Sequence, residues 1–227
     1  MKILARGEKI KTDELKQKLS AISIDWTVLD TQNYGTVNLQ DFDIIFDLNF
    51  DDHSTALAAY APLKDKPVFV SAAKKSLAQA AHHCGYKIDC VLIGINALPT
   101  FINRSLAEVS LLDTSHSDVL KSILAPLGWE YKLVADRVGF ITPRIILMII
   151  NEACYTVQEG TATMRDIDIS MKLGTNYPFG PFEWADNIGV KEVYETLEAI
   201  YQDTHDERYK ICPLLKTLYL KNGSFYN

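Results

Sequence analysis

The amino-acid sequence predicts an α/β domain, with a mostly parallel sheet covered by helices on both faces, followed by an all-helical domain. Three observations support this fold class. Short strand-like runs alternate with helical periods through residues 1–134. These runs are almost continuously apolar, which is typical of parallel strands buried on both faces. From residue 135 onward, apolar residues recur only at helical spacing. The predicted domains are therefore residues 1–134 and 135–227.

Each element follows from its own run of residues. Strands are predicted over residues 2–5, 24–29, 42–48, 67–71, 89–95, 106–112 and 131–134. Helices are predicted between them over residues 54–60, 76–83 and 118–127, with an earlier helix capped by Thr12. The second domain is predicted to form helices over residues 140–158, 164–173, 190–201 and 213–221. Gly160 and Gly174 are expected to end the first two of these helices.

Composition limits the class of protein. The chain has 227 residues, of which 48% are hydrophobic and 23% charged, with a net charge of −6. This balance excludes a disordered chain, and the acidic charge provides no basic footprint for nucleic acid. No apolar run approaches a membrane span, and the run at residues 3–5 is too short for a signal-peptide core. We therefore expect a cytoplasmic protein that binds neither nucleic acid nor membranes.

The cysteines give no sign of a disulfide framework or a metal site. Cys84, Cys90, Cys154 and Cys212 form no C-x-x-C pair, so reduced and mostly buried thiols are expected. His82 and His83 precede Cys84, but no second ligand pair at metal-site spacing accompanies them. No metal is predicted.

The segment after the first strand tests whether the α/β domain binds a dinucleotide. A G-x-G-x-x-G turn lets the backbone approach the pyrophosphate and places it on a helix N-terminus. Here Gly7 is the single glycine, Glu8 adds a negative charge, and Lys9 and Lys11 offer point charges without convergent amides. Asp30 ends the second strand, near the offset of the acidic residue that binds a ribose 2′-OH. The residues that indicate a bound dinucleotide are therefore Gly7 and Asp30.

A series of spaced motifs runs through the second domain. In order they are Gly139-Phe140-Ile141-Thr142-Pro143-Arg144, Asn151-Glu152-Ala153, Gly160, Asp166-Ile167-Asp168, Met171-Lys172-Leu173-Gly174, Pro178-Phe179-Gly180-Pro181-Phe182-Glu183, Asp186 and Gly189. This pattern resembles the C-terminal helical domain of the 3-hydroxyacyl-CoA dehydrogenases. The resemblance implies fatty acyl-CoA metabolism, an N-terminal NAD-binding domain, a helical domain that dimerises, and a substrate cleft between the two domains.

The first domain resembles the same family more weakly. Residues 42–52 resemble its strand with acidic residues near the nicotinamide, here Asp47 and Asp51. Residues 94–109 resemble the strand that carries the family's catalytic histidine and, twelve residues on, its glutamate partner. Asn96 stands at the histidine position and Glu108 at the glutamate position. In the family the histidine takes the hydroxyl proton while hydride leaves to NAD. An amide neither gains nor loses a proton near pH 7, so Asn96 is not expected to act as the base.

Two more groups hold the substrate oxygen in the family, a serine and an asparagine. By the resemblance, Lys75 stands at the serine position, with Ser76 beside it as a substitute if the register shifts. Pro143 stands at the asparagine position; it suits a first helical turn but has no group to donate to a substrate carbonyl. Lys75 is either a cation for an oxygen or a CoA phosphate, or a solvated lysine in a turn. The catalytic and cofactor motifs are thus predicted to be degenerate.

These losses favour a family member with weak or no dehydrogenase activity that binds a CoA thioester or a nucleotide between its domains. NAD is implied by the resemblance, although the altered turn argues against it, and a homodimer through the helical domain is expected. Two alternatives stay open. One is an active NAD-dependent 3-hydroxyacyl-CoA dehydrogenase with a rewired site that uses Glu108, Lys75 or His116. The other is a non-catalytic dimeric interaction protein. Pairing with an active relative instead of a second copy also stays open.

The length agrees with a reduced first domain. After Asp30 the family inserts a long helical excursion before its next strand, whereas residues 31–40 of this chain lead directly to residues 42–48. The expected first domain is therefore a shortened Rossmann-like domain, beside a helical domain of full size.

Overall fold

The computed structural model describes residues 1–31 and 37–226. The chain divides into two compact units, Met1–Phe140 and Ile141–Asn227. The division lies six residues after the boundary expected at residue 134, because the intervening segment is tied to the first unit. The carboxylate of Asp136 accepts hydrogen bonds from the amides of Leu77 and Ala78, and the amide of Gly139 donates to the carbonyl of Ala73.

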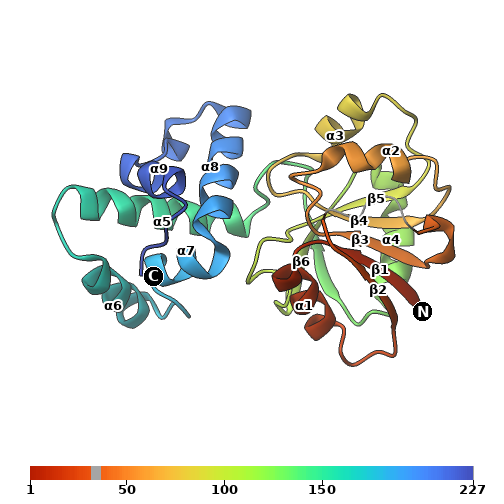
Figure 1. Cartoon of the computed structure of the whole chain (residues 1–227), viewed down its shortest axis with the longest axis horizontal. Helices are drawn as coiled ribbons and strands as arrows, with labels where there is room; N and C mark the ends of the chain where they lie inside the picture. Colours follow the sequence, from red (N-terminus) through yellow and green to blue (C-terminus); the bar gives the residue numbers. More distant parts are fainter. Residues whose placement is uncertain (32–36, 227) are drawn as a thin grey trace. The chain divides into compact units, whose positions relative to one another are not determined.

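The first unit is built on a seven-stranded sheet (Figure 1). Its strands are β1 Lys2–Arg6, β2 Asp25–Leu29, β3 Ile44–Asp47, β4 Pro67–Ser71, β5 Val91–Ile95, β6 Leu106–Leu111 and β7 Glu130–Leu133. The strand order is β2-β1-β3-β4-β5-β6-β7. Neighbouring strands are parallel except β5 and β6, which are antiparallel. The predicted mostly parallel sheet is confirmed, and each of the seven predicted runs contains a strand.

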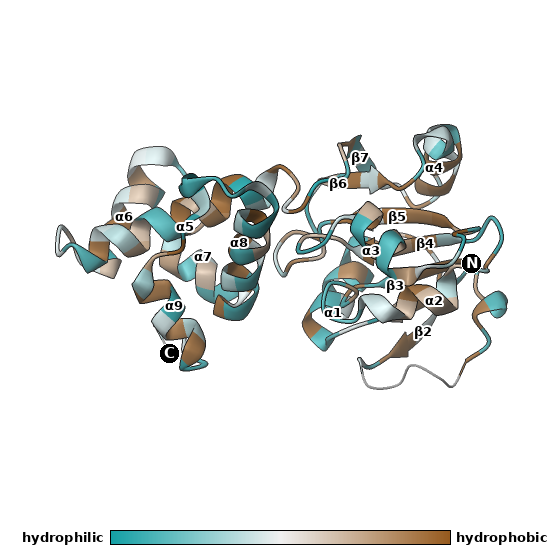
Figure 2. Ribbon diagram, turned by 90° about the horizontal axis from the view of Figure 1, so that it is seen from above, coloured by the Kyte–Doolittle hydropathy of each residue, from teal (hydrophilic) through white to brown (hydrophobic). Residues whose placement is uncertain are grey.

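Helices cover both faces of this sheet (Figure 1). They are α1 Lys9–Lys18, α2 Leu57–Tyr60, α3 Leu77–Cys84 and α4 Ser117–Leu124, with short 3-10 turns η1 Leu39–Asp41, η2 Ser54–Ala56 and η3 Thr114–His116. Leu15 of α1 and Leu120 of α4 belong to one buried cluster with Ile3 and Phe46 of the sheet. The central strands are strongly hydrophobic along their length (Figure 2), as strands buried on both faces must be.

The chain reverses direction across the sheet at β1. The connection after β1 leads to β2 on one side, and β3 then pairs with β1 on the other side. In open α/β sheets, ligands bind outside the carboxyl ends of the strands at such a switch point. The residues that follow β1, β2 and β3 therefore lie where a sheet of this kind binds its ligands. Residues 32–36, which belong to the short connection expected after Asp30, lie outside the described residues.

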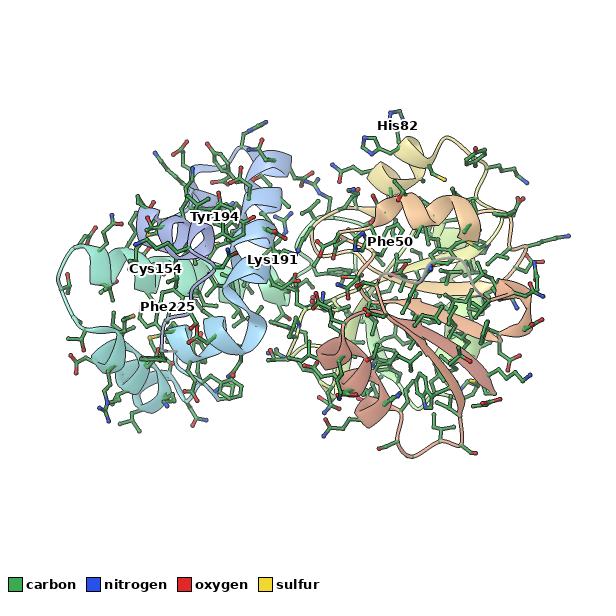
Figure 3. The ribbon with its side chains drawn as sticks, in the orientation of Figure 1. Phe50, His82, Cys154, Lys191, Tyr194 and Phe225 are labelled. Atoms are coloured by element: carbon green, nitrogen blue, oxygen red, sulfur yellow. The ribbon has the colours of Figure 1, made fainter. Side chains whose placement is uncertain are left out.

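The second unit consists of helices packed on one another. They are α5 Thr142–Gln158, α6 Met164–Thr175, α7 Pro181–Ile188, α8 Val190–Thr204, η4 Glu207–Tyr209 and α9 Pro213–Leu220. Aromatic pairs join helices distant in sequence: Tyr194 of α8 stacks on Tyr219 of α9 with ring centroids 4.1 Å apart (Figure 3). Phe225 packs against Phe182 of α7 with ring centroids 4.8 Å apart.

Two local predictions were wrong. Helix α1 begins at Lys9 with Glu8 at its N-cap, and the Thr12 hydroxyl instead donates to the carbonyls of Glu8 and Lys9 inside the first turn. Helix α6 continues through Gly174 to Thr175, and its C-cap Asn176 adopts the left-handed conformation.

Helix α7 was not predicted from the sequence. Its N-terminal amides, from Phe182 and Glu183, donate to the carboxylate of Asp168 on the preceding helix. The capping residue lies 14 positions earlier in the sequence, so no local sequence pattern predicts the start of α7.

No helix among the described residues is long and apolar enough to cross a membrane. Within residues 1–31 and 37–226, no three His, Cys, Asp or Glu side chains are grouped so as to hold a metal ion. His82 and His83 are exposed on α3, with His82 at the outer side of the helix (Figure 3). All four cysteines are free thiols, and Cys90, Cys154 and Cys212 are buried.

Candidate functional site

A pocket of about 450 Å³ lies where β1 and β2 end and α1 begins. It is lined by Gly7, Lys9, Thr12, Asp13, Lys16, Val28 and Asp30. The two residues that the sequence selected for cofactor binding, Gly7 and Asp30, therefore meet in one pocket. Its volume is within the usual range for sites of small organic ligands.

The turn after β1 is closed by bonds within the protein. Gly7 has φ +148°, and a Cβ on it would lie 2.9 Å from the side-chain oxygen of Asn49 and 3.1 Å from the Cβ of Leu48. The Gly7 amide donates to the carbonyl of Leu29, and the Glu8 amide donates to Asn49 Oδ1 at 2.9 Å. Gly7 thus permits a close approach between the turn and β3. Two amides that a dinucleotide-binding turn would offer to phosphate are already bonded.

Charged side chains surround this pocket. Asp30 is exposed, and its carboxylate accepts hydrogen bonds from the amide and hydroxyl of Thr31. Lys9 points outward and pairs with Asp13 one turn later. Lys11, which was expected to stand as a charge near the turn, is instead buried, with 2% of its surface exposed. Glu8 is exposed at the start of α1, and its side chain makes no capping bond.

Asp47 lies at the end of β3 and belongs to a buried network. It pairs with Arg6, its neighbour across β1 and β3, at 4.0 Å. The hydroxyl of Tyr60, on α2, donates to Asp47 at 2.8 Å and accepts a hydrogen bond from the Arg6 guanidinium. Burial raises the pKa of the Asp47 carboxyl to about 6, against the hydrogen bond from Tyr60 and the charge of Arg6, which lower it. Asp47 therefore serves the packing between the sheet and α2.

Asp51 closes the loop that follows β4. Its carboxylate accepts hydrogen bonds from the Ser71 hydroxyl and from the amides of Ala73 and Lys74 at 3.0 and 2.8 Å. Burial raises the pKa of Asp51, while these donors lower it. The acidic residues expected near a nicotinamide are thus both engaged within the first unit.

Asn96 and Glu108 lie at the same end of the β5–β6 ladder. Strands β5 and β6 pair as far as Ile95 opposite Val109. Asn96 directly follows Ile95, and Glu108 directly precedes Val109 on β6, where it is paired with Lys132 of β7. Asn96 is buried, and its side-chain oxygen accepts a hydrogen bond from the amide of Leu98 at 3.3 Å.

Sequence reasoning missed the cation beside Glu108. Burial lowers the pKa of the Arg104 guanidinium, and the negative charges of Glu108 and Glu14 oppose that effect. Glu14, from α1, accepts a hydrogen bond from the amide of Thr100 at 2.7 Å, and burial raises its pKa. The Glu108 carboxylate and the Arg104 guanidinium therefore interact electrostatically. The prediction from sequence overlooked Arg104 because only the glutamate itself matched a family motif.

The other expected site residues separate into distinct roles. Ser76 is the N-cap of α3, and it forms reciprocal hydrogen bonds with Gln79, each at 3.1 Å. Lys75 is half-buried, and its ammonium donates to the hydroxyl of Ser54 at 2.6 Å. Pro143 is buried in the first turn of α5, in the second unit.

His116 follows the far end of β6. Leu111 at that end pairs with Ile93, so the chain leaves β6 toward the beginning of β5. His116 therefore lies beyond the edge of the sheet opposite to Asn96 and is not positioned to replace a base there.

Several known proteins resemble this chain in sequence or in fold. The family described as "3-hydroxyacyl-CoA dehydrogenase, C-terminal domain" matches residues 139–224. A 3-hydroxybutyryl-CoA dehydrogenase of Bradyrhizobium diazoefficiens is 38% identical over 121 residues, covering 53% of this chain and 41% of that protein. A probable 3-hydroxybutyryl-CoA dehydrogenase of Bacillus subtilis is 43% identical over 135 residues, covering 58% and 47%. The matched region is thus less than half the length of these relatives.

The similarity of fold extends further than the similarity of sequence. The crystal structure of (S)-3-hydroxybutyryl-CoA dehydrogenase from Ralstonia eutropha superposes with a TM-score of 0.75 at 17% identity. The alignment covers 100% of this chain and 99% of that one. At this identity the comparison establishes the arrangement of a Rossmann-like sheet followed by helices, and it leaves the chemistry of the site to the residues described above.

Proposed function

We propose that this chain, whose residues 139–224 match the C-terminal domain of the 3-hydroxyacyl-CoA dehydrogenases, is a family member without ordinary dehydrogenase turnover that binds a nucleotide or CoA thioester. The observation that carries the proposal is the pair Asn96 and Glu108. Both residues adjoin the Ile95–Val109 pair of β5 and β6, and the resemblance assigns the catalytic base to the position of Asn96. A carboxamide neither gains nor loses a proton near neutral pH, so it does not act as a base, and the charge of Glu108 acts on the Arg104 guanidinium.

The residues around the 450 Å³ pocket fit part of the cofactor that the family implies. The exposed carboxylate of Asp30 is suited to accept hydrogen bonds from a ribose. The turn amides of Gly7 and Glu8 are bonded to Leu29 and Asn49, so they are not available to a diphosphate. This supports binding of the nucleoside part of a nucleotide and argues against the usual seating of NAD.

An exposed apolar stripe on α6 supports self-association of the second unit. Ile169 and Leu173 are one turn apart and are 45% and 83% exposed. Burial of these two side chains against a partner would remove apolar surface from water. We propose a homodimer through it, and light scattering on Leu173→Glu tests this: the change should convert a dimer into a monomer, whereas an unchanged mass contradicts it. The same stripe also favours the second candidate function, that of a non-catalytic protein that acts by binding a partner.

A direct assay tests the main proposal. The purified chain is mixed with acetoacetyl-CoA and NADH, and oxidation of NADH is followed by absorbance; no turnover above the background without protein is expected. Melting shifts with AMP, NADH and CoA are measured in parallel, and a shift without turnover supports the proposal. NADH consumption that Glu108→Gln abolishes would overturn it in favour of a rewired dehydrogenase. A dimer that responds to none of the ligands would favour the interaction protein.

A further inference from the structure

A lysine at the carboxyl edge of the sheet lacks a counter-charge. Lys75 lies in the loop between β4 and α3, and its side chain is half-buried. Its ammonium donates one hydrogen bond, to the neutral hydroxyl of Ser54. Among the described residues, no carboxylate pairs with it. An ammonium has three N–H donors, so one bond to a neutral oxygen leaves both charge and donors for another acceptor.

The neighbouring carboxylates are committed to other donors. Asp51 accepts from the Ser71 hydroxyl and from the amides of Ala73 and Lys74. Asp52 pairs with the ammonium of Lys74 at 3.0 Å. The two consecutive lysines therefore differ: Lys74 has a carboxylate partner, and Lys75 has a hydroxyl that holds its side chain in place.

The position of Lys75 favours a ligand. The loop begins where β4 and β5 end side by side, with Ser71 opposite Ile95, so Lys75 shares the carboxyl edge of the sheet with Asn96. Ligands of open α/β sheets bind outside this edge. A half-buried cation is also costly to hold without a compensating negative charge.

We propose that Lys75 binds an oxyanion of the ligand, a phosphate or a carboxylate, and so gives this site a preference for negatively charged groups. The inference rests on the proposed function, because it places the CoA thioester or nucleotide at this edge. Serine at the corresponding family position suits a neutral oxygen; the ammonium of Lys75 adds a charge that strengthens bonds to anionic oxygens.

Binding of a series of ligands tests this assignment by calorimetry. Comparison of free CoA with dephospho-CoA tests whether a phosphate supplies the anion. Comparison of glutaryl-CoA with butyryl-CoA tests whether a carboxylate on the acyl group supplies it. The wild-type chain is compared with Lys75→Gln, Lys75→Arg and Lys64→Gln. Lys64 is exposed and in the same unit, so its variant controls for the loss of one positive charge.

We expect Lys75→Gln to weaken binding of CoA roughly 10- to 100-fold if a phosphate is the anion. If a carboxylate is the anion, the wild type prefers glutaryl-CoA over butyryl-CoA by a similar factor, and Lys75→Gln removes that preference. Lys75→Arg retains most of the affinity, and Lys64→Gln changes it less than twofold. Melting of each variant without ligand confirms that it is folded.

Equal affinities of Lys75→Gln and Lys64→Gln for every ligand would overturn the inference. So would a wild type that binds all of these ligands without regard to their charge, or none of them. Failure of the proposed function is seen separately, as NADH turnover with acetoacetyl-CoA, which does not depend on the comparison of Lys75 variants.

Discussion

The hydroxyl of Tyr60 donates a 2.8 Å hydrogen bond to the carboxylate of Asp47, which lies 13 residues earlier at the end of β3. Both side chains are fully buried, and Arg6 on β1 completes the network. This contact places a charged group in the layer between the sheet and α2. Its energetic role is therefore open to measurement.

Removal of the Tyr60 hydroxyl should destabilise the chain. In Tyr60→Phe the ring remains, but Asp47 and Arg6 lose a buried partner, and we expect the free energy of unfolding to fall by about 1–3 kcal/mol. Urea denaturation measures the difference. Tyr86→Phe is the control, because Tyr86 is 67% exposed, and it should change stability by less than about 0.5 kcal/mol. Equal effects of the two changes would contradict a role for the hydroxyl.

The Asp47 carboxyl should make stability depend on pH. Burial raises its pKa from 3.8 to about 6 in the folded chain. A carboxyl with a raised pKa stabilises the fold when protonated; the contribution is complete below the unfolded pKa and is lost as pH rises through the folded pKa. Relative to Asp47→Asn, the wild type should therefore lose about 2–3 kcal/mol between pH 4 and pH 7. Urea unfolding at unit intervals of pH checks this, and parallel pH curves for the two proteins would refute it.

Asp30 should select for a ribose. If its carboxylate accepts a bond from a 2′-OH, the wild type should bind AMP roughly tenfold more tightly than 2′-deoxy-AMP, and Asp30→Asn should reduce this difference. Calorimetry with both nucleotides measures the ratio. Asp13→Asn is the matched control, since Asp13 lines the same pocket but pairs with Lys9. An unchanged ratio in Asp30→Asn would rule out the assigned contact.

Two glycines in the second unit should respond in opposite ways to alanine. A Cβ on Gly180 would lie 2.2–2.4 Å from atoms of the Asp168 side chain, so Asp168 must move and release the amides of α7 that it caps. We expect Gly180→Ala to cost about 2 kcal/mol or more of unfolding free energy. Gly174 lies in α6 with nothing within 4 Å of its Cβ position, and Gly174→Ala should be neutral or stabilise by about 0.5–1 kcal/mol. Thermal and urea unfolding of both variants measure these changes in stability. A Gly180→Ala variant as stable as the wild type would contradict the close approach of Gly180 to Asp168.

Asp136 should hold the start of α3. Its carboxylate accepts bonds from the amides of Leu77 and Ala78 at 2.8 and 2.9 Å, so Asp136→Ala should cost about 0.5–2 kcal/mol. Hydrogen exchange should show faster exchange of these two amides. Asp118→Ala provides the comparison, because Asp118 is an exposed acid in the first turn of α4; its effect on α3 should be nil.

Much of the fold was predictable because it depends on local pattern. Strand-like runs, most of them continuously apolar, located the seven strands of the sheet, and helical spacing located four of the five α-helices described in the second unit. Asn96 and Glu108, twelve residues apart, adjoin the same end of the antiparallel pair β5 and β6, and their assigned roles stay a prediction. The helix α7 was not foreseen, because the carboxylate that caps it belongs to Asp168 on another helix.

The candidate site was predictable in part. Gly7 and Asp30 were identified from the spacing of a nucleotide-binding turn, and they line one pocket. The closure of that turn by Asn49 was not foreseen, because the bond joins residues 41 positions apart. Arg104 was missed because only Glu108 matched a family motif, and its burial and the nearby charge of Glu14 arise only on folding.

The sequence by itself determined the order of elements, the family of the helical domain and the absence of a histidine at position 96, because these follow from residue type and short-range spacing. Tertiary structure alone decided which charges are compensated. Asp47, Asp51 and Asp136 find their donors across strands and loops, while Lys75, next to the ion-paired Lys74, meets a hydroxyl. Electrostatic partnership depends on distances of a few ångströms, and folding sets those distances between residues that are remote along the chain.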